Sequence, residues 1–188
     1  MTELLVLCTG NAARSVMAGF MFDALGAGRP DDPLHVVTAG THTIDGQPMG
    51  LRTRTALSRL PELAGADFRR HRSRQVHGVD FEHAELVVVM EADHVRFVRR
   101  QFPDAAAKTA TIRHLCEHLA PAPPVLGQRV AALGLDTVEL NDSEDVLDPA
   151  GHEADVYAAC VDEVWGLCQR LVTLSDVPLC AAGVMQPA

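Results

Sequence analysis

LLVLCTGNAARSVMA, residues 4–18, is the stretch of sequence that decides the fold. An apolar run from Leu4 to Leu7 precedes a turn at Gly10 and Asn11, and residues typical of a helix follow. This order predicts a buried strand, a tight loop and a helix from about Ser15 to Leu25. The rest of the chain can be organised around this unit.

The loop between the predicted strand and helix has the properties of an anion site. The first backbone N–H groups of a helix have no internal partner, and the helix dipole adds partial positive charge there. Gly10 and Asn11 readily adopt the left-handed backbone angles that let successive amides converge on one point. We therefore expect a phosphate-binding loop made of Thr9, Gly10, Asn11, Ala12, Ala13, Arg14 and Ser15.

Three side chains of this loop suggest nucleophilic chemistry. Cys8 lies at the mouth of the loop, and its thiolate would be stabilised by the amides, the helix dipole and Arg14. The guanidinium of Arg14 offers a fixed fork of donors that matches two oxygens of a phosphoryl group. The hydroxyl of Ser15 can donate to the Cys8 sulfur, which would stabilise the sulfur as nucleophile and as leaving group.

Further strands and helices alternate along the chain, which predicts a parallel sheet with helices on both faces. The clearest strand is Glu85 to Met90, because four consecutive apolar residues fit a strand that is covered on both sides. The other expected strands are Leu34 to Thr38 and Thr109 to Ile112; the expected helices are Leu51 to Leu60, Glu91 to Gln101, Val125 to Leu135 and His152 to Leu174. We expect a single α/β domain over residues 1–174 and a loosely ordered tail over residues 175–188.

The composition limits the possible binding partners of the protein and the cellular compartment in which we expect it. Sixteen Lys and Arg residues against 25 Asp and Glu residues give a net charge of −9, which disfavours nucleic acid as a partner. No apolar run approaches the ~18 residues of a membrane span, and the first residues do not resemble a signal peptide. Five cysteines without close-paired spacing indicate no disulfide framework. We expect a cytoplasmic protein, with a monomer favoured.

The segment from Cys8 to Ser15 resembles the phosphate-binding loop of the low-molecular-weight protein tyrosine phosphatases, which is shared by related arsenate reductases. The resemblance implies a four-stranded parallel sheet, a Rossmann-like arrangement, and hydrolysis of phosphate monoesters, with phosphotyrosine protein as the substrate. It implies a phosphocysteine formed on Cys8, with Asp148 of the Asp148-Pro149 pair as general acid and base. It also implies that Thr38 and His71 hold the loop asparagine. No metal or other cofactor is required, because Arg14 and the amides supply the electrostatic stabilisation.

The chain departs from the family pattern at two places. Ala150 and Gly151 stand where many members have aromatic residues after the Asp-Pro pair, and His42 and Ile44 stand in the loop where others have Trp. An aromatic phosphate ester therefore has few stacking partners, so a small phosphate ester is a further candidate substrate. Ala13 occupies the place of a second cysteine that could protect the nucleophile, so we expect no such disulfide at Cys8.

Two alternative functions follow from the same residues. Arsenate reduction would use Cys8 with an external small thiol, since the helix Glu91 to Gln101 contains no cysteine and Cys116 and Cys180 are isolated. A metal-binding module could use His114, Cys116 and His118, which would share one face of a strand. In a helix, Cys116 would point away from the two histidines, and no fourth ligand is evident.

Overall fold

The structure is a computed structural model that describes residues 2–27, 34–123 and 125–175. Its centre is a four-stranded parallel sheet in the order β2-β1-β3-β4. The strands are β1 Thr2–Cys8, β2 Leu34–Gly40, β3 Leu86–Val89 and β4 Thr109–Thr111. The predicted parallel sheet and its four strands are therefore confirmed. In this order, the two central strands β1 and β3 end side by side, each followed by a loop at the same edge of the sheet.

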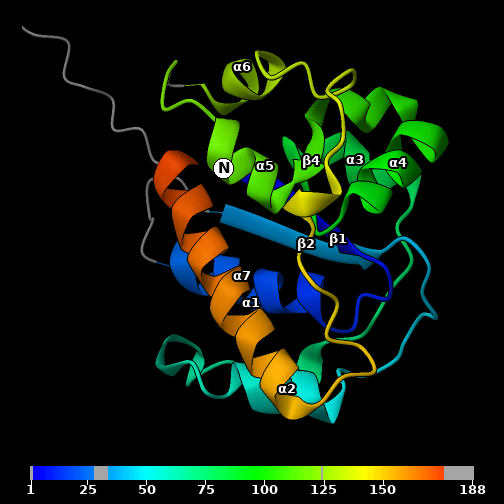
Figure 1. Ribbon diagram of the computed structural model, residues 1–188. Coiled ribbons are helices and arrows are strands. Elements are labelled where there is room, and N and C mark those ends of the chain that lie inside the picture. Colours follow the sequence, from blue (N-terminus) through cyan, green and yellow to red (C-terminus); the bar gives the residue numbers. More distant parts are fainter. Residues whose placement is uncertain (1, 28–33, 124, 176–188) are drawn as a thin grey trace, which may run out of the picture.

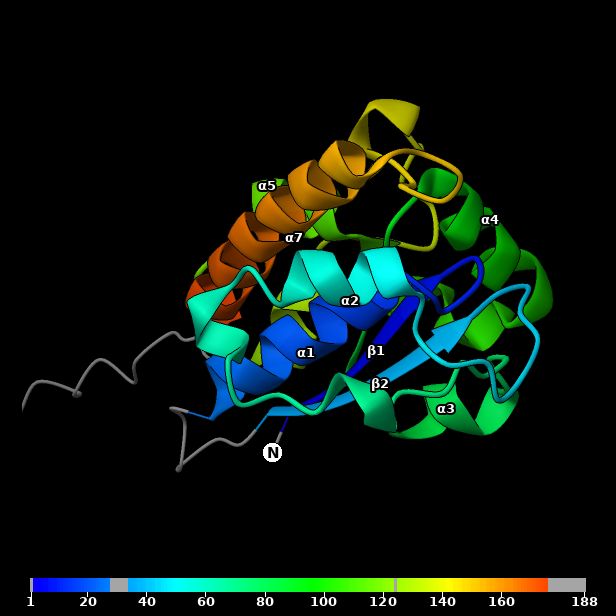
Figure 2. The same ribbon diagram turned by 90° about the horizontal axis from the view of Figure 1, so that it is seen from below.

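Helices cover both faces of the sheet (Figures 1 and 2). Helix α1 follows the loop after β1, and α7 packs along α1, as the numerous contacts between the two helices show. Helices α3 and α4 lie against the other face. The helices are α1 Arg14–Gly26, α2 Leu51–Leu57, α3 Gly78–His83, α4 Ala92–Gln101, α5 Ile112–His118, α6 Leu126–Ala131 and α7 Ala154–Ser175. Short 3-10 turns are Pro61–Leu63, Phe68–Arg70, Pro103–Lys108 and Asp142–Glu144.

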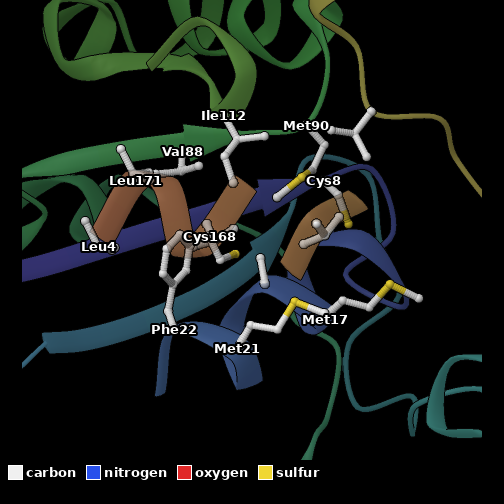
Figure 3. Close-up of a cluster of buried hydrophobic side chains, with 14 of the residues drawn as sticks. Leu4, Cys8, Met17, Met21, Phe22, Val88, Met90, Ile112, Cys168 and Leu171 are labelled. Atoms are coloured by element: carbon white, nitrogen blue, oxygen red, sulfur yellow. The ribbon is translucent and has the colours of Figure 1, made fainter. Parts of the chain in front are cut away.

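The alternation of side chains along β1 divides the core into two clusters. Leu4, Val6 and Cys8 face α1, α5 and α7, whereas Leu5 and Leu7 face α3 and α4. Successive side chains of a strand point to opposite faces, so a strand buried on both sides must be apolar throughout. Figure 3 shows Cys8 at the carboxyl end of β1, at the edge of the larger cluster.

Helix α7 buries its apolar stripe as its spacing predicts. Cys160, Val164, Cys168 and Leu171 are each at most 4% exposed. Burial raises the pKa of the Cys160 thiol to about 12, with a smaller contribution from Glu163, and burial also raises that of Cys168 well above its ordinary value. These two cysteines are therefore packed as uncharged core thiols.

The element boundaries differ from the prediction in the helices that carry little apolar periodicity. Helix α2 ends at Leu57, three residues before the predicted end, and a turn leads into Pro61–Leu63. Helix α6 covers Leu126–Ala131 only, because the chain turns to a positive φ of 60° at Gly134. Of the predicted tail, residues 175–188, the structure describes only Ser175, which is the last residue of α7; residues 176–188 lie outside the described residues, as do residues 28–33. No helix in the described ranges has the length and apolarity to cross a membrane.

Candidate active site

The sulfur of Cys8 lies between β1 and the first turn of α1. Its Sγ is 2.9 Å from the hydroxyl oxygen of Ser15, and both residues are buried. Ser15 Oγ also accepts a hydrogen bond of 3.1 Å from the side-chain amide of Asn11. The amide therefore occupies an acceptor position of the hydroxyl, which leaves the hydroxyl proton available to the sulfur. The predicted contact between Ser15 and Cys8 is present.

Asn11 holds the shape of the loop. It has a φ of 47°, the left-handed region that asparagine tolerates better than most residues. Its side chain is fully buried and donates to Thr38 Oγ1 at 3.1 Å, and its carbonyl oxygen lies 2.9 Å from His71 Nε2. Asn11 Oδ1 accepts from the backbone N–H of Arg74 at 3.1 Å. Thr38 and His71 thus lie where they can hold the loop asparagine, one through its side chain and the other through its main chain.

Two threonines and a glycine close the loop from outside. Thr43 Oγ1 donates to the carbonyl oxygen of Gly10 at 2.7 Å, and Thr53 Oγ1 donates to that of Ala12 at 3.1 Å. These bonds direct two loop carbonyls outward, which is compatible with inward N–H groups. Gly40 ends β2 against the loop, and a Cβ atom there would lie 2.6 Å from the carbonyl oxygen of Thr9. The close approach of the two chains requires glycine at this position.

Arg14 is almost completely buried, with 1% of its surface exposed. Its Nη1 donates to a carboxylate oxygen of Glu91 and, at 2.9 Å, to the carbonyl oxygen of Val146. Its Nη2 donates to Asp148 Oδ2 at 2.7 Å. Its Nε is buried and finds no hydrogen-bond acceptor among the described residues. A buried charged donor without a partner is costly, and an oxyanion in the loop would supply the acceptor.

Asp148 comes to the loop from the segment that precedes α7. Its side chain is 38% exposed, so it faces both Arg14 and solvent. Asp148 Oδ1 accepts from the backbone N–H of Ala150 at 3.0 Å, which orients the carboxylate. Asp145, the neighbouring acid, instead accepts from the N–H of Ala92 at 2.7 Å, at the start of α4. The structure thus brings Asp148 to Arg14 and turns Asp145 toward another helix.

The chain matches a known protein family over most of its length. Residues 3–123 match the model of the family described as low molecular weight phosphotyrosine protein phosphatase. The chain belongs to this family. It is a phosphatase, a hydrolase that acts on phosphorylated substrates. The match ends before Asp148, so the position of that residue rests on the geometry described above and on the Asp-Pro pair.

Relatives of this phosphatase carry two substrate names. A protein-arginine-phosphatase of Geobacillus stearothermophilus is 27% identical over 169 residues, covering 90% of this chain and 93% of the relative. A low molecular weight protein tyrosine phosphatase from T. tengcongensis is 26% identical in sequence, with a TM-score of 0.71 and coverage of 92% and 99% of the two chains. A solved arginine phosphatase from Geobacillus stearothermophilus has a TM-score of 0.69 at 24% identity, covering 92% of each chain.

Two residues beside the loop of this phosphatase did not emerge from sequence reasoning. Glu91 pairs with Arg14, and His94 Nε2 lies 3.0 Å from Thr9 Oγ1. Burial, with Arg14 as the next cause, lowers the pKa of His94 to about 4. Glu91 comes two residues after the end of the short apolar strand β3, a position that places it at the carboxyl edge of the sheet, where α/β folds bind ligands. Its position after a buried strand was the one sequence signal that could have indicated Glu91 as a residue of the site.

Proposed function

We propose that this phosphatase hydrolyses phosphate monoesters through a phosphocysteine, with Cys8 as nucleophile, Arg14 as phosphate ligand and Asp148 as general acid and base. The observation that carries the proposal is the convergence of three groups on one loop: the hydrogen-bonded Cys8 sulfur, the buried Arg14 guanidinium and the Asp148 carboxylate 2.7 Å from it. An unpaired buried Nε does not by itself single out Arg14, because Arg99, Arg113 and Arg129 share that feature. Arg14 differs from them in lying beside the nucleophile, where its fork of donors can hold a phosphoryl group.

The first step transfers the phosphoryl group to the protein. The Cys8 thiolate attacks phosphorus, an S–P bond forms, and the bond from phosphorus to the ester oxygen breaks. Asp148 gives its proton to that departing oxygen, so an alcohol or phenol leaves rather than an alkoxide or phenoxide. The loop amides and Arg14 stabilise the charge on the equatorial oxygens during the transfer.

The second step restores the enzyme. Asp148, now a carboxylate, takes a proton from a water molecule as the water oxygen attacks phosphorus. The S–P bond breaks, inorganic phosphate is released, and the thiolate of Cys8 returns, with the hydroxyl of Ser15 2.9 Å away to stabilise it. The same group therefore acts as acid in the first step and as base in the second.

Arg14 and Asp148 must exchange partners when substrate binds. Their 2.7 Å ion pair occupies one edge of the guanidinium. A phosphoryl dianion brings more charge and more acceptor oxygens than one carboxylate, so it displaces Asp148 from that edge. The displaced carboxyl group stays at the mouth of the loop, where it can protonate the leaving oxygen. Arg14 thereby couples phosphate binding to the release of the general acid.

The proposed substrate class is a phosphorylated protein side chain, with phosphotyrosine as the first candidate on the basis of family membership. Phosphoarginine is the second candidate, because the relative that covers 90% of this chain is a protein-arginine-phosphatase. With this substrate a P–N bond would break in place of the ester bond, and Asp148 would give its proton to the departing guanidine nitrogen. Side chains near the loop include the exposed Ile44 and Leu147, at 74% and 61%, and no exposed aromatic ring is among the large exposed apolar residues of the described ranges. Contacts to an aryl ring would therefore come from aliphatic side chains and from the exposed imidazole of His42, whose backbone N–H donates to the carbonyl oxygen of Thr9 at 2.9 Å.

The test compares hydrolysis of an aryl phosphate and an alkyl phosphate by the wild type, Cys8→Ser, Asp148→Asn and the control Asp104→Asn. Asp104 is exposed and precedes β4, at the edge of the sheet opposite the loop. We expect no turnover by Cys8→Ser, full activity of the control, and a larger loss with Asp148→Asn for the alkyl ester, whose leaving group needs the proton more. Full activity of Cys8→Ser would refute the phosphocysteine, and equal losses on both esters would remove Asp148 as the acid.

Substrate choice is decided by release of inorganic phosphate from two peptides of one sequence, one with phosphotyrosine and one with phosphoarginine. A preference for the first, measured as the ratio of kcat/KM values, supports the first candidate, and the reverse ratio supports the second. Arsenate with a small thiol is a third assay on the same preparation. Thiol-dependent loss of arsenate without phosphatase activity would favour the reductase alternative over hydrolysis.

A further inference from the structure

The histidines of α5 form a cluster outside the active site. The sequence pattern His114, Cys116 and His118 falls in a helix, which turns Cys116 away: its Sγ is directed to the carbonyl oxygen of Leu167 on α7. His114 and His118 are one helical turn apart and their ring centres lie 4.4 Å from each other. The two imidazoles therefore share one face of α5 without the cysteine between them.

Glu144 supplies a third donor to this cluster from a distant part of the chain. It lies in the 3-10 turn Asp142–Glu144, and its Oε1 is 3.0 Å from His114 Nδ1. One atom each of His114, His118 and Glu144 lies within 4.8 Å of the others. We propose that His114, His118 and Glu144 form a binding site for a divalent transition-metal ion of the zinc type, separate from the phosphate loop.

Two of the three donors are already fixed in place. Thr111 Oγ1 accepts from the backbone N–H of His114 at 3.1 Å and donates to Glu144 Oε2 at 2.8 Å, so one hydroxyl holds both groups. The side chains of His114 and Glu144 are only 11% and 14% exposed. A metal ion would replace the proton that now lies between His114 Nδ1 and Glu144 Oε1. His114 would then carry its proton on Nε2.

The third donor is free to complete the geometry. Donor atoms around one tetrahedral zinc ion lie about 3.3 Å apart, as metal–ligand bonds of about 2.0–2.1 Å require. The present separation of up to 4.8 Å must therefore close by about 1.5 Å. The side chain of His118 is 52% exposed and can move by that amount through a change of rotamer. Three protein ligands leave one position of a tetrahedral ion open to water.

The surroundings of the cluster favour a cation. The hollow beside it is lined by His114, His118, Ala132, Leu133, Val138, Glu139, Asn141 and Glu144, which include two carboxylates and no Lys or Arg. Imidazole and carboxylate are ligands typical of Zn²⁺, whereas Mg²⁺ and Ca²⁺ prefer sets made of oxygen alone. The donor set therefore selects a transition metal over the hard cations.

The site would connect the start of α5 to the segment that carries the general acid. From Glu144 the chain continues to Val146, whose N–H donates to the carbonyl oxygen of Met90 at 2.8 Å and whose carbonyl oxygen accepts from Arg14. Asp148 follows two residues later. A bound metal ion would thus attach this segment to α5 at a point four residues before Asp148, without touching the phosphate loop.

The experiment measures Zn²⁺ binding to the metal-free full chain by competition with a chromophoric chelator. The wild type is compared with His118→Ala, Glu144→Gln and the control His83→Ala. His83 is an exposed histidine at the end of α3, so it matches His118 in type and exposure. Because His118 is exposed, its replacement leaves the fold intact, and zinc bound to Cys8 would remain in every one of these proteins.

We expect the wild type and His83→Ala to bind one more Zn²⁺ per chain than His118→Ala, and Glu144→Gln to bind that ion at least tenfold more weakly. Co²⁺ at the same site should give d–d absorption, lost in His118→Ala, without the charge-transfer band of a thiolate ligand. Equal stoichiometry and affinity in the wild type and His118→Ala would overturn the proposal. A loss in His83→Ala as large as that in His118→Ala would overturn it as well.

Discussion

The neutral, buried His94 makes a quantitative prediction about acid stability. Only 3% of its surface is exposed, its Nε2 bonds to Thr9 Oγ1, and its Nδ1 has no hydrogen-bond partner in the part of the chain that the structure describes. Burial is the main cause that lowers its pKa to about 4, from 6.5 in an unfolded chain. Arg14 and His42 also lower the pKa, whereas Asp148 and Asp93 raise it. The carboxylate of Glu91, with Oε2 3.4 Å from His94 Nε2, is a further acidic group against the ring.

The sign of the effect follows from where the proton binds. Between pH 6.5 and pH 4 the unfolded chain takes up a proton at His94 and the folded chain does not, so acid favours unfolding. The stabilisation is fully present above pH 6.5 and is lost as the pH falls toward 4. Each pH unit in this interval corresponds to about 1.4 kcal/mol, so lowering the pH from about 7 to about 5 should cost about 2 kcal/mol of unfolding free energy through His94.

Urea unfolding of the wild type and His94→Gln at those two pH values provides the assay. Glutamine can keep a hydrogen bond to Thr9 but does not titrate, and every other titrating group, His71 included, is common to both proteins. The wild type should lose about 2 kcal/mol more than the variant on acidification. Equal losses in the two proteins would show that His94 takes up its proton in the folded state as readily as in the unfolded one, and the reasoning would fail.

Three further substitutions test the phosphate loop. Ser15→Ala should lower kcat/KM for an aryl phosphate by about 10- to 100-fold, because a hydrogen bond to a charged sulfur contributes ~1.5–3 kcal/mol; an unchanged value would separate the hydroxyl from catalysis. Thr38→Val keeps the shape but removes the acceptor of the loop asparagine, and thermal unfolding should report a loss of about 1–2 kcal/mol. Gly40→Ala places a methyl group 2.6 Å from the Thr9 carbonyl oxygen, so phosphatase activity should fall by at least tenfold while circular dichroism still reports a folded chain.

The sheet and the first helix could be predicted because their signals are local. The four consecutive apolar residues of β3, Leu86–Val89, are fully buried. So short a run of apolar residues is typical of a strand that is covered by helices on both faces of the sheet. The loop after β1 could be predicted equally well, because an apolar strand, a left-handed turn and the start of a helix follow one another within 15 residues. Local order in the sequence was sufficient for both.

The surroundings of Arg14 come from three distant segments and could be predicted only in part: the family resemblance implied Asp148 at the site, whereas nothing in the sequence pointed to a contact with Glu91 or Val146. Glu91 follows β3, Val146 offers a main-chain oxygen, and Asp148 precedes α7. A backbone carbonyl has no sequence signature. The segment before Asp148 has neither a hydrophobic periodicity nor a pattern of helix-breaking residues that would place it against the loop. The metal-type pattern on α5 was visible as two histidines at helical spacing, but Glu144 lies 26 residues beyond His118 and only the folded chain brings them together.

The contacts of Asn11 also bear on how the protein would lose activity under mild denaturation. Its side chain and carbonyl oxygen depend on Arg74 and His71, which lie in a stretch outside the helices and strands of the sheet. Such stretches open by local fluctuations that need less free energy than global unfolding. Each opening would release the loop while the sheet persists, so catalysis should vanish at a lower urea concentration than the helical signal.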